Sequence, residues 1–112
     1  MIVRADAPSG VQAAMVIHAA GHSAQLPGAC SASPPTVAVA LLASVDDLLA
    51  LARALVHLDI PHVLVREPDE PWCNAPMAIG VVPIERARVR RLFASLPLAG
   101  GRANDGRGKA TP

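Results

Sequence analysis

One stretch near the middle of the chain constrains the fold most, because a strand signal is followed directly by a helix signal. The run from Val37 to Leu42 is almost continuously apolar, which is typical of a strand that is buried on both faces of a sheet. Ser44 then provides a helix cap, and the acidic pair Asp46 and Asp47 lies in the first turn, where the helix dipole favours negative charge. The helix is predicted to bury one stripe against the strand, consisting of Val45, Leu48, Leu49, Ala52, Leu55 and Val56.

Further strand and helix patterns lie on both sides of this unit. Strands that are separated by helices pair in parallel, whereas two strands joined by a short link can pair antiparallel. The sequence therefore predicts an α/β fold: a small mixed β-sheet of about four strands, in the order β-α-β-α-β-β-α, with helices on both faces. The remaining elements are expected as a strand starting at Ile2, a helix capped by Ser9 and ending near Gly21 or Ser23, strands at 62–66 and 77–82, and a helix from Ile84 to Leu96.

Length and composition limit the classes of protein to which the chain can belong. With 112 residues it is expected to form one domain over residues 1–98, followed by a disordered tail over 99–112 that is rich in glycine and polar residues. No apolar run approaches the roughly 20 residues that span a bilayer, and no signal peptide is recognisable. A cytoplasmic protein without membrane contact is therefore expected. The two cysteines, Cys30 and Cys73, are expected to be reduced, although a single disulfide stays open.

The composition also excludes two kinds of chemistry. The only lysine is Lys109 in the expected tail, so no lysine is available for catalysis within residues 1–98. Trp72 and Phe93 are the only aromatic residues of the Phe, Trp and Tyr classes, which argues against a protein that binds single-stranded nucleic acid by stacking bases on a row of aromatic rings. The net charge of +1 provides little long-range attraction for an acidic partner.

Two separated blocks carry a resemblance to a known family. The first block runs from Val3-Arg4-Ala5-Asp6 through a turn into the segment from Gln12 to Ala20, which contains His18. The second runs from Ile60 to Glu67 and, after a loop, from Ala78 to Pro83. In this order, over roughly residues 1 to 98, they resemble the peptidyl-tRNA hydrolases of the archaeal and eukaryotic type. The resemblance implies a hydrolase with an α/β architecture, which cleaves the ester between a peptidyl or acyl group and tRNA without a cofactor.

Glu67 is the strongest candidate for chemistry. It follows the strand pattern Val63-Leu64-Val65, so it is expected just beyond the carboxyl end of a strand, where open α/β sheets bind ligands. In the family that the chain resembles, the matching position holds an aspartate of the site. Glu67 could act as the base that activates water. The alternatives are a solvated loop carboxylate or an ion-pair partner of Arg66.

The family's other polar site residues are altered in this chain. The family's histidine falls at His18, which can act as a base or a donor near neutral pH, or can be a packed histidine bonded to backbone. The family's lysine falls at Val11, its glutamine at Met15 and its threonine at Pro71, so these three polar groups are lost. Asp69 in the same loop is a candidate to replace the threonine, with an ordinary surface acid as the alternative.

Charged residues supply the candidates for substrate binding. Arg4 and Asp6 match the family's Arg-x-Asp and are expected to form an ion pair that fixes the following turn, with substrate contact as a second role. Arg66 is expected to hold tRNA phosphates, because guanidinium groups suit phosphate geometry. The arginines of the last helix could assist or could form a solvated surface; they are Arg86, Arg88, Arg90 and Arg91.

Three functions stay open at this stage. The first is hydrolysis of peptidyl-tRNA, with Glu67 and His18 as catalytic residues and tRNA as substrate. The second is a module of the same fold that has lost catalysis and binds tRNA or a protein. The third is a hydrolase of another substrate. No metal is expected, because His18 and His22 are four residues apart on one helix but lack the glutamate of a His-Glu-x-x-His motif. A homodimer is one option for an alanine-rich surface.

Overall fold

The computed structural model describes residues 1–29 and 37–100, and it shows the α/β fold and the element order that the sequence predicts. The described strands are β1 (Ile2–Arg4), β2 (Leu41–Ala43), β3 (His62–Glu67) and β4 (Ala75–Val81). The described helices are α1 (Ser9–Ser23), α2 (Val45–His57) and α3 (Arg86–Phe93).

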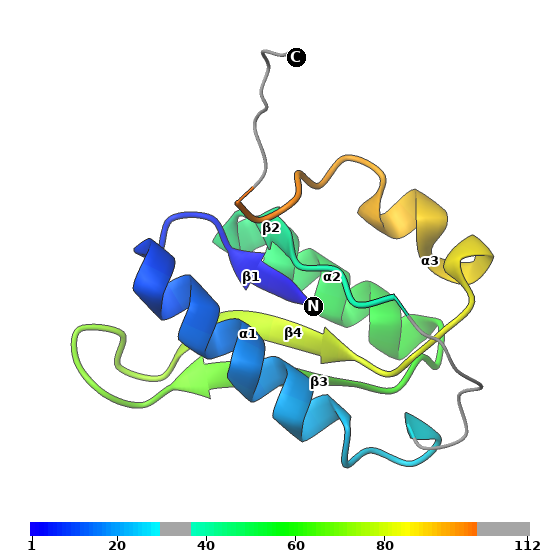
Figure 1. Cartoon of the computed structure of the whole chain (residues 1–112), viewed down its shortest axis with the longest axis horizontal. Coiled ribbons are helices and arrows are strands. Elements are labelled where there is room, and N and C mark those ends of the chain that lie inside the picture. Colours follow the sequence, from blue (N-terminus) through cyan, green and yellow to red (C-terminus); the bar gives the residue numbers. More distant parts are fainter. Residues whose placement is uncertain (30–36, 101–112) are drawn as a thin grey trace.

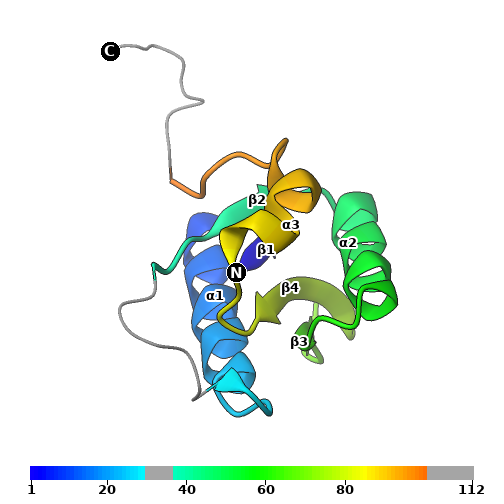
Figure 2. The same cartoon turned by 90° about the vertical axis from the view of Figure 1, so that its right-hand side faces the viewer.

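The four strands form one mixed sheet in the order β2-β1-β4-β3. β1 pairs in parallel with β2 and antiparallel with β4, which in turn pairs antiparallel with β3. α1 and α2 lie on opposite faces of this sheet (Figures 1 and 2). The carboxyl ends of β1, β2 and β3 therefore lie at one edge, together with the start of β4 and the start of α1. We call this edge the carboxyl edge.

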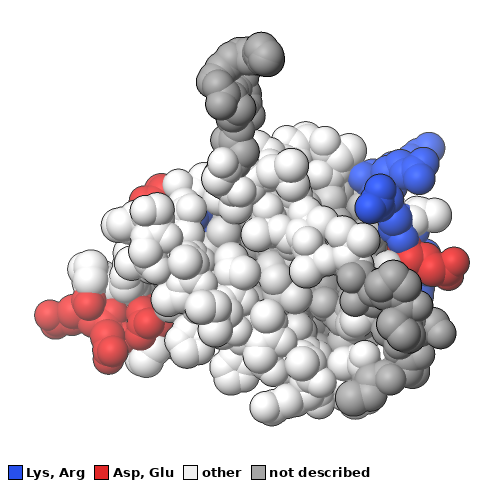
Figure 3. All heavy atoms as spheres, viewed as in Figure 1, with Lys and Arg blue, Asp and Glu red and all other residues white. Residues whose placement is uncertain are grey.

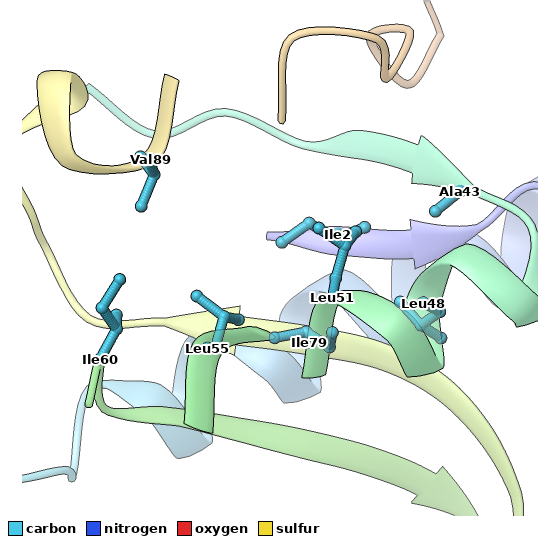
Figure 4. Packing of buried hydrophobic residues seen from close by; sticks show 8 residues of the cluster. All are labelled: Ile2, Ala43, Leu48, Leu51, Leu55, Ile60, Ile79 and Val89. Carbon is cyan, nitrogen blue, oxygen red and sulfur yellow. The ribbon is translucent and has the colours of Figure 1, made fainter. Parts of the chain in front are cut away.

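Each face of the sheet has its own apolar cluster. The side chains of neighbouring strand residues point to opposite faces, so Ile2 belongs to the cluster under α2 and Val3 to the cluster under α1. α3 closes the first cluster with Val89, which Figure 4 shows above the α2 residues. The buried members of the α2 cluster are Ile2, Ala43, Leu48, Leu51, Leu55, Ile60, Ile79 and Val89. Those of the α1 cluster are Val3, Ala7, Met15, Ala19, Val65, Met77 and Ala78.

α1 lies unusually close to the sheet at one point. A methyl group added at Gly80 of β4 would overlap the backbone carbonyl of Ala19 and would come within 3.0 Å of the Ser23 side chain. Ala19 is fully buried, and Ser23 is the one polar residue among the described residues that is buried. The absence of a side chain at Gly80 therefore sets the depth at which α1 packs.

The strand predicted over Val37 to Leu42 is wrong in its extent. β2 contains only Leu41–Ala43, and Val37 is 75% exposed rather than buried on both faces. The reason is that the neighbouring strand β1 has three residues, so only three residues of the apolar run can pair with it. The last helix is likewise shorter than expected, because it covers Arg86–Phe93.

Two helix details also differ from the prediction. Ser9 is the first residue of α1 rather than its cap; Pro8 holds that position, and its carbonyl accepts a hydrogen bond from the N–H of Gln12 at 2.9 Å. In α2, Val56 is 69% exposed, whereas Leu51 is buried in its place. The predicted cap of α2 is confirmed, because the Ser44 hydroxyl accepts a hydrogen bond from the N–H of Asp47 at 3.1 Å.

The segment after α3 returns to the sheet beside β2. The N–H of Leu42 donates to the Pro97 carbonyl, and the N–H of Ala99 donates to the Ala40 carbonyl, each at 2.8 Å. This pairing covers the outer side of β2, which would otherwise be a free edge strand. Of the tail that was expected from residue 99, only Ala99 and Gly100 are described; residues 101–112 and Cys30 lie outside the described residues.

Candidate functional site at the carboxyl edge

Arg4 is the centre of a contact network at the end of β1. Its Nε and second terminal nitrogen donate to the two carboxylate oxygens of Asp6 at 2.7 and 2.9 Å, which confirms the predicted ion pair. Its other terminal nitrogen donates to the Pro76 carbonyl at the start of β4, at 3.2 Å. The guanidinium also lies 5.1 Å from the ring centre of Trp72, within the range of a cation–π contact. Arg4 thus fastens the turn after β1 to the distant stretch that contains Trp72 and the start of β4.

The ion pair is asymmetric in its exposure. The Arg4 side chain is 12% exposed, whereas the Asp6 side chain is 61% exposed. Hydrogen bonding to Asp6 raises the pKa of Arg4, and the same hydrogen bond lowers the pKa of the Asp6 carboxyl from its ordinary value. Both groups are therefore charged at neutral pH. Arg4 is largely occupied by protein partners, which leaves it better suited to positioning than to binding a phosphate.

Gln12 completes the network from the first turns of α1. Its side-chain amide donates to the carbonyls of Arg4 and Ala5, at 3.3 and 3.2 Å. These bonds join the start of α1 to the end of β1. No role was predicted for Gln12; the sequence signal that points to it is an amide side chain in the first turns of a predicted helix, and the structure shows that this position is half-buried.

Glu67 lies at the carboxyl end of β3, as predicted, and its side chain is half-buried. Its Oε1 accepts a hydrogen bond from the N–H of Asp69 at 3.2 Å, and its own carbonyl accepts one from the N–H of Asn74 at 2.6 Å. Both bonds close the loop between β3 and β4 onto Glu67. The carboxylate is therefore held by its own loop through Oε1.

An irregular pairing just before Glu67 shapes this end of the hairpin. Val65 pairs with Ala78, but the next residue, Arg66, pairs with Pro76, so the register passes over Met77. Proline has no N–H to continue the ladder, and such bulges bend a strand and change the direction of its side chains. Arg66 is exposed here, and one of its terminal nitrogens donates to the Asn74 carbonyl at 3.0 Å.

Arg4 and Glu67 share the carboxyl edge but are two strands apart. β4 separates β1 from β3, and neighbouring strands are about 4.8 Å apart, so the backbones of these residues are separated by at least about 10 Å. Trp72 extends from the β3–β4 loop toward Arg4 and packs against the α1 cluster. The structure thus brings five predicted site residues to one edge: Arg4, Asp6, Arg66, Glu67 and Asp69.

No contact of the described residues links His18 to the site residues at the carboxyl edge. His18 is exposed in the second half of α1, about 14 Å along the helix axis from Ser9, and its ring stacks on that of His22 with 6.2 Å between ring centres. Val11, in contrast, lies at the start of α1 and packs with the α1 cluster beside Trp72. Over the described part of the chain, no three His, Cys, Asp or Glu side chains gather as metal ligands.

Charge is distributed unevenly over the two ends of the molecule. Acidic side chains gather at the end where the β3–β4 loop lies, and basic side chains gather at the opposite end, over α3 (Figure 3). The arginines of α3 are exposed and far from Glu67 in the fold, so they cannot act on the same group of a small substrate. Close to Glu67, acidic residues outnumber basic ones: Asp6, Glu67, Asp69 and Glu70 stand against Arg4 and Arg66.

These groups can perform a limited range of chemistry. A half-buried carboxylate at the end of a strand can take a proton from water, and the exposed guanidinium of the preceding residue, Arg66, can bind an anion. Cys73 is a free and exposed thiol in the same loop. In none of the described helices is there an apolar stretch long enough to cross a membrane. Compared with known families and characterised proteins, the sequence matches no family model and no curated protein.

Proposed function

We propose that the carboxyl edge hydrolyses the ester between a peptidyl or acyl group and tRNA, in the manner of peptidyl-tRNA hydrolases of the archaeal and eukaryotic type. One observation carries the proposal: the half-buried Glu67 at the carboxyl end of β3, held by its own loop beside Arg66. The order of strands and helices and the two sequence blocks support it. A cytoplasmic location belongs to the same proposal, because peptidyl-tRNA is a product of translation.

The proposed reaction needs only water and the protein. The Glu67 carboxylate takes a proton from a water molecule while the water oxygen bonds to the ester carbon. The bond between that carbon and the ribose oxygen then breaks, and the ribose oxygen leaves with a proton. The products are a free peptide and a tRNA with a free hydroxyl. No lysine takes part, since the family's lysine is replaced by the apolar Val11.

Arg66 is the proposed phosphate contact. A guanidinium has five N–H donors, so its bond to the Asn74 carbonyl leaves donors for a phosphate next to Glu67. Arg4 positions the site instead, because it joins Asp6, Pro76 and Trp72. Asp69 contributes its N–H to the Glu67 carboxylate, and its own side chain is exposed.

The first test is turnover of peptidyl-tRNA by the purified full chain and by Glu67→Gln. Glutamine keeps the oxygen that accepts the Asp69 N–H, so the loop retains its hydrogen bond while the base is lost. The expected result is a fall in kcat of at least about a hundredfold, since a positioned general base contributes 10²–10⁴-fold. Glu85→Gln is the matched control, because Glu85 precedes α3 at the opposite end of the molecule and its side chain makes no cap bond.

A second function is favoured by the excess of acidic residues around Glu67. Besides the half-buried Glu67, three exposed carboxylates lie at the end where a tRNA terminus with its phosphates would have to bind, and Arg66 is the one exposed cation there among the described residues. This charge suits a neutral or cationic substrate, which would make the protein a hydrolase of another ester or amide. Turnover of a peptidyl-tRNA would contradict this candidate.

Measuring tRNA binding together with turnover distinguishes a hydrolase from a binding module that has lost catalysis. Phosphate contacts release counterions, so a tRNA complex should weaken steeply as salt increases. Salt-sensitive tRNA binding without turnover would support the binding module, and neither binding nor turnover would contradict both tRNA proposals. Light scattering on the same sample tests the proposed homodimer.

A further inference from the structure

A large apolar cavity lies at the end of the molecule opposite Glu67. Its volume is about 640 Å³, which falls within the roughly 300–1,000 Å³ that is usual for small-molecule sites. It lies between the end of α1, the start of β1 and the inner side of α3. This end of the molecule faces the viewer in Figure 2. The apolar wall of the cavity includes Val39, Leu41, Val81, Ile84, Val89 and Phe93.

Two arginines supply the charged side chains that line this cavity. Arg86 and Arg90 are four residues apart on α3, so they share one face of the helix, and both line the cavity. No Asp or Glu is found among the described residues that line it. The arginines at 88 and 91 belong to the same helix but do not line the cavity. The cavity therefore combines an apolar interior with two cationic side chains from α3, and Met1, whose N-terminal ammonium donates to the Val39 carbonyl at 2.8 Å, lines it from the β1 side.

This combination selects a particular kind of ligand. A guanidinium binds a carboxylate through two parallel hydrogen bonds, so the two arginines favour an anionic head group. The apolar wall stabilises a hydrocarbon body in proportion to the area that it removes from water. A nucleotide or polyphosphate would leave most of the apolar wall without hydrophobic contacts. A neutral hydrocarbon would leave both arginines without an anionic group to bind.

We infer that this cavity binds a small amphipathic carboxylate, with its carboxylate on Arg86 and Arg90 and its hydrocarbon chain against the wall of Val39, Leu41 and Phe93. A free fatty acid of medium chain length has this chemistry. The inference does not rest on the proposed hydrolysis, because Glu67 and the cavity lie at opposite ends of the sheet. Failure of one proposal therefore leaves the other unaffected.

The charge requirement is tested with decanoate as the probe and the full chain as the protein. Calorimetric titration should show one bound decanoate per chain, and decanol should bind at least tenfold more weakly, because it lacks the carboxylate. The double variant Arg86→Gln/Arg90→Gln should lose at least tenfold in affinity for decanoate. Arg88→Gln/Arg91→Gln, which removes the same charge from the same helix outside the cavity, should bind as the unaltered chain does.

The position of the hydrocarbon chain is tested by filling the cavity. Ala20 is an exposed position of α1 that lines the cavity, so Ala20→Phe should place a ring inside it and abolish decanoate binding. Ala13→Phe is the control, since Ala13 is exposed on the same helix and does not line the cavity. Circular dichroism confirms that both variants fold.

Three outcomes would overturn the inference. The first is the absence of decanoate binding by the unaltered chain. The second is equal binding of decanol and decanoate, or equal loss in the two arginine double variants, which would mean that Arg86 and Arg90 hold no carboxylate. The third is full affinity in a folded Ala20→Phe protein, which would place decanoate elsewhere on the surface.

Discussion

At the scale of single residues, Arg4 has the largest structural role at the carboxyl edge. It holds Asp6 through two hydrogen bonds, the start of β4 through the Pro76 carbonyl and the β3–β4 loop through Trp72. The side chain is mostly shielded from water, so these contacts are screened less than those of a surface ion pair. Its position therefore depends on Asp6 being charged.

Replacement of this partner should change the stability of the protein in a pH-dependent way. The Arg4 hydrogen bond lowers the pKa of Asp6 in the folded state, so the carboxylate stabilises the fold above its ordinary pKa of about 3.9 and loses this effect as the pH falls through the lower, folded-state pKa. Asp6→Asn should therefore lower the free energy of unfolding at pH 7, by less than about 1 kcal/mol because Asp6 is largely exposed. Urea midpoints from pH 7 to pH 2 measure this.

The difference in the free energy of unfolding between Asp6→Asn and the unaltered protein should disappear at the acidic end of that series. Asp59→Asn, at an exposed position in the turn after α2, is the control for the loss of one negative charge. A difference in the free energy of unfolding that is the same at pH 2 and pH 7 would show that the charge of Asp6 does not stabilise the fold.

The sequence predicted part of this network but not all of it. The Arg4–Asp6 pair is local, two residues apart in a turn, so spacing alone indicates it. The bonds to Pro76 and to Trp72 join segments that are distant in the chain, and only the strand order β1-β4-β3 brings them together. His18 was grouped with Glu67 through family resemblance, whereas the structure places it in the second half of α1 beside His22.

At the scale of secondary-structure elements, the contact between α1 and β4 depends on the absence of a side chain. Gly80 allows the backbone of α1 at Ala19 to approach β4 closely. The alanine-rich helix suits such a close approach, because small residues add little bulk between the two backbones. α1 is therefore positioned by the fit at Gly80 as well as by burial of large side chains such as Met15.

Substitution of two glycines should produce opposite changes in stability. Gly80→Ala should lower the free energy of unfolding by about 2 kcal/mol, since overpacking a filled interface typically costs 1–3 kcal/mol. Gly21→Ala should raise it by about 0.5–1 kcal/mol, because alanine is a better helix former and the Cβ at Gly21 would meet open space. Chemical denaturation compares the two, and stabilisation by Gly80→Ala would contradict the close packing.

Element types were easier to predict than element lengths. Apolar runs and helical periodicity indicated every described strand and helix, because an element must place apolar side chains wherever it faces the core. The extent of β2 was wrong because it is limited by the three residues of β1, which is information from another part of the chain. The exposure of Val56 follows in the same way from where α2 meets the sheet.

At the scale of the whole molecule, charge and cavity separate the two ends. The end at Glu67 is acidic, whereas the end at α3 is basic and contains the apolar cavity. A ligand that is steered by charge will therefore distinguish the two ends, even though the net charge of the sequence is only +1. The tRNA proposal therefore requires that a phosphate-bearing substrate bind at the acidic end, and the effect of this charge on binding can be measured.

Neutralising the acidic loop should help a phosphate-bearing substrate to bind. The double variant Asp69→Asn/Glu70→Gln removes two exposed negative charges next to Glu67, so its KM for peptidyl-tRNA should fall severalfold at low salt and approach that of the unaltered protein at high salt. Steady-state kinetics at two salt concentrations measure this. Glu85→Gln/Asp59→Asn is the control for total charge, and an increase in KM in the loop variant would favour a cationic substrate.

The strand order also governs how a growing chain can reach this structure. β1 lies in the interior of the sheet, yet its partner β4 comes much later in the sequence, and the Arg4–Pro76 hydrogen bond joins residues 72 positions apart. While the polypeptide is being synthesised, Ile2 and Val3 therefore have no β4 to cover them until Ala75 to Val81 has left the ribosome. Neither apolar cluster can close before that point, since Ile79 belongs to one and Ala78 to the other. A nascent chain that ends before β4 should consequently remain unfolded, and the whole sheet should form in a single cooperative step.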